Sequence, residues 1–195
     1  MNQHPSSHPH PDPPPRAGEG EGARAGEGWR MLRRGLILAA LILAADQASK
    51  HYMLFVLHLP IVQHIPLVEI GPFGFDLTMV WNRGVTFGLL AADAAWTQFA
   101  LGALALVIAG VLLRWMARAD NRTTAFALGA VIGGAVGNVI DRIRFGAVAD
   151  FFDAHAWGWH WYVFNVADAA IVLGVLALVA DALFRPPAGV KPSAP

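Results

Sequence analysis

The residues of this chain best suited to chemistry are two aspartates that lie on either side of the start of its last apolar segment. Asp150 lies in Val148-Ala-Asp-Phe-Phe-Asp153, and Asp168 lies in Phe164-Asn-Val-Ala-Asp168. Asp168 falls within a run long enough to cross a bilayer, where an ionisable group costs about 2.5–3.5 kcal/mol at mid-depth. Ionisable groups in such positions mark functional sites by default, so both aspartates are candidate catalytic acids.

The chemistry that two neighbouring carboxylates can perform is general acid–base catalysis. At a separation of about 4 Å they would repel by roughly 4 kcal/mol at an effective dielectric of about 20, so one should hold a proton at neutral pH. The ionised acid could then take a proton from water, while the protonated acid hydrogen-bonds a developing oxyanion. The structural alternative is that each acid is satisfied separately by Arg142, Arg144 or an asparagine. Asp141 and Asp153 are expected to be structural.

Composition describes a membrane protein and removes several other chemistries. Of the 195 residues, 55% are hydrophobic and 14% are charged, against roughly 25% charged in a soluble domain. The zero net charge and the lack of a basic run argue against nucleic-acid binding. There is no cysteine, Ser49 lies in no nucleophile motif, and no His-Glu-x-x-His pair is present, so no metal or cofactor is expected.

Apolar segments predict an all-α membrane protein with four transmembrane helices. They cover residues 35–57, 94–113, 123–140 and 161–184, lengths that match a hydrocarbon core of about 30 Å at about 1.5 Å per residue. We expect residues 29–186 to form the folded domain, residues 1–28 to be a disordered cytoplasmic tail, and residues 187–195 to be a second tail. A signal peptide is the alternative for the first segment, but its apolar pattern resumes at Met53.

The distribution of charge predicts the orientation. Ten of the fourteen Lys and Arg residues lie before the first segment, between the second and third, or after the fourth. The positive-inside rule therefore places both termini in the cytoplasm. Residues 73–82 alternate between apolar and other side chains and are followed by the turn sequence Asn82-Arg-Gly84, which predicts a strand in an extracytoplasmic β region over residues 58–92. An ordinary hairpin without a role in binding is the alternative.

Counting along each helix places several polar residues in one shallow layer. By this count Asp46 lies about 12 Å below the outer edge of the membrane, Asn138 about 6 Å and Asp168 about 10 Å. Helical spacing puts Asn138 on the same face as Arg142. In the third segment Gly129, Gly133 and Gly137 recur every four residues and favour close helix packing.

Five motifs taken together resemble one known family, bacterial lipoprotein signal peptidase, also called signal peptidase II. They appear in the family's order over residues 30–185: Asp46-Gln-x-x-Lys50, Asn82-x-Gly84-x-x-Phe-Gly88, Gly137-Asn-x-x-Asp-Arg142, Val148-x-Asp-Phe151 and Phe164-Asn-x-Ala-Asp168. Each motif alone is weak, but the ordered set on four segments is specific.

The resemblance implies an aspartic endopeptidase that removes signal peptides from prolipoproteins, just before a cysteine that already carries diacylglycerol. It implies a monomeric, multi-pass protein of the bacterial inner membrane, with its active site near the periplasmic face and in contact with membrane lipid. By motif position Asp150 and Asp168 correspond to the catalytic pair. The residues expected to bind substrate or support the pair are Asp46, Lys50, Asn82, Gly84, Asn138, Arg142 and Asn165.

Two other classes of protein are compatible with intramembrane acids. A small ion- or proton-coupled transporter would place polar residues at several depths and often contain an internal repeat, whereas here they gather near one face and no repeat is evident. An accessory subunit would merely pair its acids with arginines.

Overall fold

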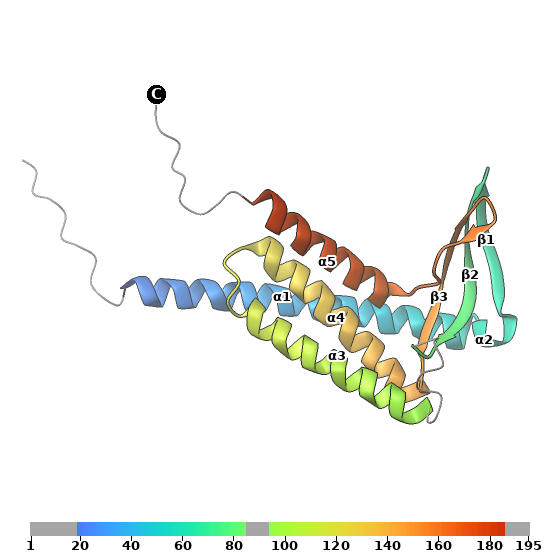
Figure 1. Cartoon of the computed structure of the whole chain (residues 1–195), viewed down its shortest axis with the longest axis horizontal. Coiled ribbons are helices and arrows are strands. Elements are labelled where there is room, and N and C mark those ends of the chain that lie inside the picture. The colour runs from blue at the N-terminus through green and yellow to red at the C-terminus, as the bar shows by residue number, and fades with distance from the viewer. Residues whose placement is uncertain (1–18, 85–93, 186–195) are drawn as a thin grey trace, which may run out of the picture.

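The computed structural model describes residues 19–84 and 94–185, which form a helical bundle with a small sheet across one end (Figure 1). The elements in chain order are α1 (Glu19–His51), the π-helix η1 (Tyr52–Val56), α2 (Leu59–Val62), β1 (His64–Ile70), β2 (Phe73–Asn82), α3 (Ala94–Met116), α4 (Arg122–Phe145), β3 (Val148–Ala156), β4 (Trp159–His160) and α5 (Val166–Phe184).

Helix α4 is the centre of the bundle and packs against α1, α3 and α5. Its glycines make this possible: a Cβ atom on Gly129 would overlap the backbone of Gly35 in α1, and one on Gly133 would overlap the backbone of Ala39. The expectation that this glycine series serves helix packing is therefore confirmed. Close backbone approach makes α4 the best buried of the long apolar helices.

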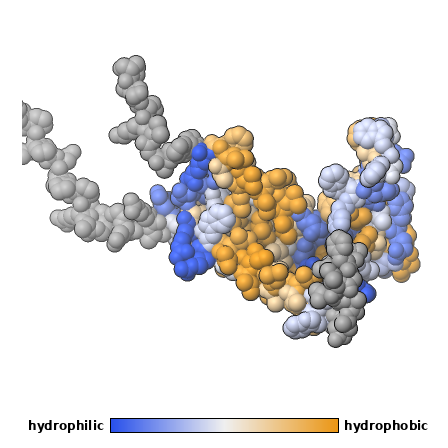
Figure 2. All heavy atoms as spheres, viewed as in Figure 1, coloured by the Kyte–Doolittle hydropathy of each residue, from blue (hydrophilic) through white to orange (hydrophobic). Residues whose placement is uncertain are grey.

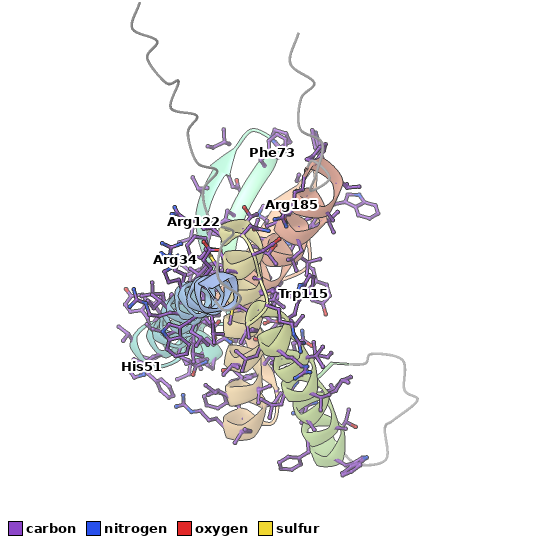
Figure 3. The ribbon with its side chains drawn as sticks, turned by 90° about the vertical axis from the view of Figure 1, so that its left-hand side faces the viewer. Arg34, His51, Phe73, Trp115, Arg122 and Arg185 are labelled. Atoms are coloured by element: carbon purple, nitrogen blue, oxygen red, sulfur yellow. The ribbon has the colours of Figure 1, made fainter. Side chains whose placement is uncertain are left out.

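Within the described residues, three helices are long and apolar enough to cross a membrane: Trp96–Met116, Arg122–Phe145 and Val166–Phe184. Helix α1 is longer, but its last turns carry the polar stretch from Asp46 to Lys50 and it is not one of these three helices, so a fourth crossing stays a prediction. Figure 2 shows an apolar band between two more hydrophilic ends. Arg34, Arg122 and Arg185 gather at the end of the bundle away from the sheet (Figure 3).

The sheet is antiparallel with the strand order β1-β2-β3-β4. Strand β2 covers the residues expected from the alternation. The β region expected between the first two membrane segments is present as β1 and β2, and the connection between α4 and α5 adds β3 and β4 to the same sheet. Strand β3 pairs along β2, and its buried Phe151 packs in one cluster with Leu54 of η1 and Leu59 of α2. Burial of this apolar cluster recruits the distant segment into the sheet.

Two boundaries also differ from the expected ones. Helix α1 begins at Glu19, inside the segment expected to be disordered, because each residue added to a formed helix gains a backbone hydrogen bond without a new nucleation cost. Helix α5 begins at Val166 rather than near residue 161, because Phe164 is held in an extended bridge to Phe152 and Asn165 caps the helix. The expected tails over residues 1–18 and 187–195, and residues 85–92 of the β region, lie outside the described residues.

Candidate active site

Strand pairing and a tight turn position Asp150. Val80 of β2 lies opposite Asp150 of β3, and two residues further on, Asn82 Nδ2 donates to Asp150 Oδ2 at 2.9 Å. The Asn82 amide can face only one way, because its Oδ1 accepts from the backbone N–H of Gly84 at 2.9 Å. Gly84 has φ of 82°, a left-handed conformation that suits glycine. The turn therefore directs the amide donor at the carboxylate.

Asp168 is the third residue of α5 and takes part in a capping box with Asn165. The backbone N–H of Asp168 donates to Asn165 Oδ1 at 2.9 Å, and the Asn165 N–H donates to Asp168 Oδ2 at 3.3 Å. From α4, Asn138 Nδ2 donates to Asp168 Oδ1 at 2.8 Å. The short polar motif that starts the helix thus also fixes the carboxylate.

Asn165 joins the two aspartates into one site. Its side chain is fully buried, and its Nδ2 donates to Asp150 Oδ1 at 2.6 Å while its Oδ1 accepts from Asp168 as described above. Asp150 therefore receives one amide donor on each oxygen. The accessory-subunit alternative requires that the acids pair with arginines. Within the described part of the chain, no salt bridge links either aspartate to an arginine.

The site favours retention of one proton. Burial, followed by the negative charge of Asp168, raises the pKa of Asp150 to about 7, although the hydrogen bonds from Asn82 and Asn165 oppose the shift. The Asp150 side chain is fully buried, whereas Asp168 is partly exposed. A carboxyl group that titrates near neutral pH beside a second carboxylate is suited to both acid and base catalysis.

A buried lysine lies behind the aspartates. Lys50 Nζ lies 2.8 Å from Asp46 Oδ2 and 2.8 Å from Asp141 Oδ2, and all three side chains are almost completely buried. It also donates to Asn138 Oδ1 at 3.2 Å. This last contact orients the Asn138 amide, so that its Nδ2 faces Asp168.

Asp46 connects this lysine cluster to the start of α5. Its Oδ1 accepts from the backbone N–H of Ala167 at 3.0 Å, which satisfies a donor that the first helical turn would otherwise leave free. Gln47 lies beside it and donates to both Asp46 Oδ2 and Asp141 Oδ1. The cluster thereby holds α1, α4 and α5 together beneath the two aspartates.

Arg142 lies at the edge of the site without a bond to either aspartate. Its Nη1 donates to the carbonyl of Asn138 at 3.1 Å, one turn earlier in α4. Its Nε is buried and has no hydrogen-bond partner among the described residues. The guanidinium is therefore close to the site and retains donors for a ligand.

Two adjoining pockets open onto the aspartates. One of about 310 Å³ is lined by Asp168 together with Ala169 and Val172 of α5, and one of about 490 Å³ is lined by Asp150, Arg83 and Gly84. Asn82, Trp161 and Tyr162 line both pockets. A molecule that bridges them would pass both carboxylates.

A model of the family described as signal peptidase (SPase) II matches residues 38–184 of the chain. The chain belongs to the signal peptidase II family. It is 45% identical to a lipoprotein signal peptidase of Methylobacterium sp. (strain 4-46) over 80% of this chain and 92% of that protein. It is 48% identical to a lipoprotein signal peptidase of Methylorubrum extorquens (strain PA1) over 77% of this chain and 86% of that protein.

A solved structure supports the fold of this signal peptidase II family member. It is described as a bacterial membrane enzyme structure obtained by the in meso method at 1.9 Å resolution. The two chains share 23% sequence identity with a TM-score of 0.64, over 78% of this chain and 94% of the other.

All nine residues that the sequence singled out lie in this one connected region, and their roles stay predictions. Sequence reasoning missed Gln98 of α3, whose Nε2 donates to the Arg83 carbonyl at 2.6 Å beside Asn82. A polar residue within an expected membrane segment was the available signal.

A separate polar cluster lies further along the sheet, where Asp153 accepts from Thr78 and contacts His160. Burial alone would raise the pKa of Asp153, but these two contacts together lower it.

Proposed function

We propose that this protein is an aspartic endopeptidase that removes the signal peptide from diacylglyceryl-modified prolipoproteins, with cleavage just before the lipid-modified cysteine. The observation that carries the proposal is the bridge through Asn165, which ties a buried Asp150 with a raised pKa to Asp168. The substrate follows from the names of the relatives, which are lipoprotein signal peptidases.

The proposed reaction is hydrolysis by an activated water molecule. The ionised carboxylate of the pair takes a proton from water as the water oxygen bonds to the scissile carbonyl carbon. The protonated carboxyl group hydrogen-bonds the oxyanion that forms. When the C–N bond breaks, the carboxyl group that hydrogen-bonded the oxyanion gives its proton to the departing amine. The pair titrates as a unit, and with a pKa of about 7 Asp150 carries a proton in about half of the molecules at pH 7.

The surrounding residues orient this pair or hold the substrate. Asn82, Asn138 and Asn165 present amide donors to the carboxylates. Gly84 permits the turn that directs Asn82. Arg142 has unused donors and is proposed to contact the substrate backbone beside the cysteine. Lys50 and Asp46 keep the three helices in register behind the site.

Membrane attachment of the substrate gives the enzyme its selectivity. A diacylglyceryl group stays in the bilayer and holds the neighbouring peptide bond near the interface. Ala169 and Val172 of α5 line the pocket beside Asp168. This apolar wall would receive an acyl chain of the substrate. We place the monomeric protein in the inner membrane with four crossings, both termini in the cytoplasm and the site near the periplasmic face.

The direct test uses the purified full chain in lipid vesicles with two forms of one prolipoprotein. One form carries diacylglycerol on its cysteine and the other carries none. Mass spectrometry should find a single cut before the modified cysteine and at least a tenfold slower cut of the unmodified form. Equal cleavage of the two forms would contradict the lipid requirement, and no cleavage of either would contradict the proposed function.

A further inference from the structure

Helix α3 reaches the active site through one buried side chain, that of Gln98. Only 4% of Gln98 is exposed, and its Nε2 donates to the carbonyl oxygen of Arg83 at 2.6 Å. A buried amide is costly unless it is hydrogen-bonded. An apolar residue of similar volume would fill this place at less cost if packing were its only role, so the bond to the turn calls for an explanation.

The same helix face clamps the turn at a second point. A Cβ atom on Gly84 would overlap Leu101 Cδ1, and Leu101 lies one turn after Gln98 on α3. Gln98 therefore holds the turn at the Arg83 carbonyl, and Leu101 packs against it at Gly84. These two contacts restrict movement of the turn, although the Arg83 side chain is exposed.

This turn is the part of the fold that orients Asn82. The N–H of Gly84 holds Asn82 Oδ1, and Asn82 Nδ2 then reaches Asp150 Oδ2, each bond being 2.9 Å long. Rotation of the Arg83 peptide would move Gly84 and release the amide. A continuous series of contacts therefore runs from α3 to the proposed catalytic pair.

We infer that Gln98 is a positioning residue of the active site: by holding the Arg83 carbonyl, it fixes the Asn82–Gly84 turn and keeps the Asn82 amide against Asp150. The inference rests on the proposed function, because it assigns a role through Asp150. Gln98 itself touches neither aspartate in any described contact.

The test is Gln98→Met, which keeps the volume but removes the amide. We expect kcat to fall about three- to tenfold, which is the value of one ordinary hydrogen bond, with KM changed less than about twofold. The hydrogen bond from Asn82 is one of the interactions that lower the pKa of Asp150. Its loss should move the alkaline limb of the pH–rate profile to higher pH. The matched control is Phe99→Leu, at the adjacent residue of α3, which is 64% exposed and should match the wild type in both respects.

A double-mutant cycle with Asn82→Ala completes the test. If Gln98 acts through Asn82, adding Gln98→Met to Asn82→Ala should lower kcat by less than about twofold more. Independent, multiplying effects would overturn the inference. So would a lower melting temperature of Gln98→Met without a shift of the pH profile, which would indicate a purely structural role. An inactive wild type would instead overturn the proposed function.

Discussion

Asp150 should make the stability of the protein depend on pH in a calculable way. Burial, and then the charge of Asp168, raise its pKa to about 7 in the folded protein, against about 3.9 in an unfolded chain. For a carboxyl group whose pKa is raised on folding, the stabilisation is complete below the unfolded pKa and is lost as the pH rises through the folded pKa. The relevant window therefore runs from about pH 4 to about pH 7.

The size of the effect follows from linkage. Between about pH 5 and about pH 8, the free energy of unfolding of the wild type should fall by roughly 2–3 kcal/mol because of this one group. Asp150→Asn cannot ionise, so that part of the pH dependence should vanish. Groups that do not interact with the pair contribute equally to both proteins, so the difference between the two curves reports the titration of the Asp150–Asp168 pair.

Equilibrium unfolding in mixed detergent micelles, followed by tryptophan fluorescence at both pH values, provides the measurement. Asp153→Asn is the control, because Asp153 lies on the same strand and is buried, yet its pKa is lowered. It should retain the wild-type loss between these pH values. Parallel curves for the wild type and Asp150→Asn would refute the reasoning.

Three further substitutions test the packing and capping around the site. Lys50→Met leaves Asp46 and Asp141 buried without a cation, and thermal unfolding should show a free energy of unfolding lower by about 3–5 kcal/mol. Arg33 is exposed, so Arg33→Met should change this free energy by less than about 0.5 kcal/mol. Equal stability of the two variants would contradict the prediction. Gly137→Ala drives a Cβ atom into Asp46 Oδ2 and should destabilise by about 1–3 kcal/mol, whereas Gly110→Ala on α3 meets open space and should not. Asn165→Ala and Asn121→Ala each remove a helix N-cap worth about 1 kcal/mol, but only the first should lower kcat; full activity of Asn165→Ala would argue against its bridging role.

Local patterns in the chain predicted two of the helices and one strand well. Apolar runs gave α3 and α4 to within a few residues, and alternation gave β2. The start of α5 could not be read in this way, because the apolar run begins earlier than the helix. The bridge between Phe152 and Phe164 is a tertiary contact that holds the intervening chain extended. The periodicity of apolar residues along the chain does not predict tertiary contacts of this kind.

Strand β3 was missed for a related reason. Its pairing with β2 joins residues 66 to 83 positions apart, and such pairing depends on the fold rather than on local sequence. Asp168 could nevertheless be singled out because an ionisable side chain is costly within an apolar segment, whereas Asn82, Gly84 and Asn165 were named from the resemblance to the signal peptidase II motifs. Gln98 is also polar within such a segment, but its partner is a backbone carbonyl and no motif contains it.

Cleavage by single-aspartate variants tests the central claim most directly. The full chain carrying Asp150→Asn or Asp168→Asn, reconstituted in vesicles and shown to be folded, should cleave the lipid-modified prolipoprotein at least about a thousandfold more slowly than the wild type, since each variant removes the acid–base function of the pair. Asp153→Asn should remain active. Substantial turnover by either of the first two variants would contradict catalysis by this pair.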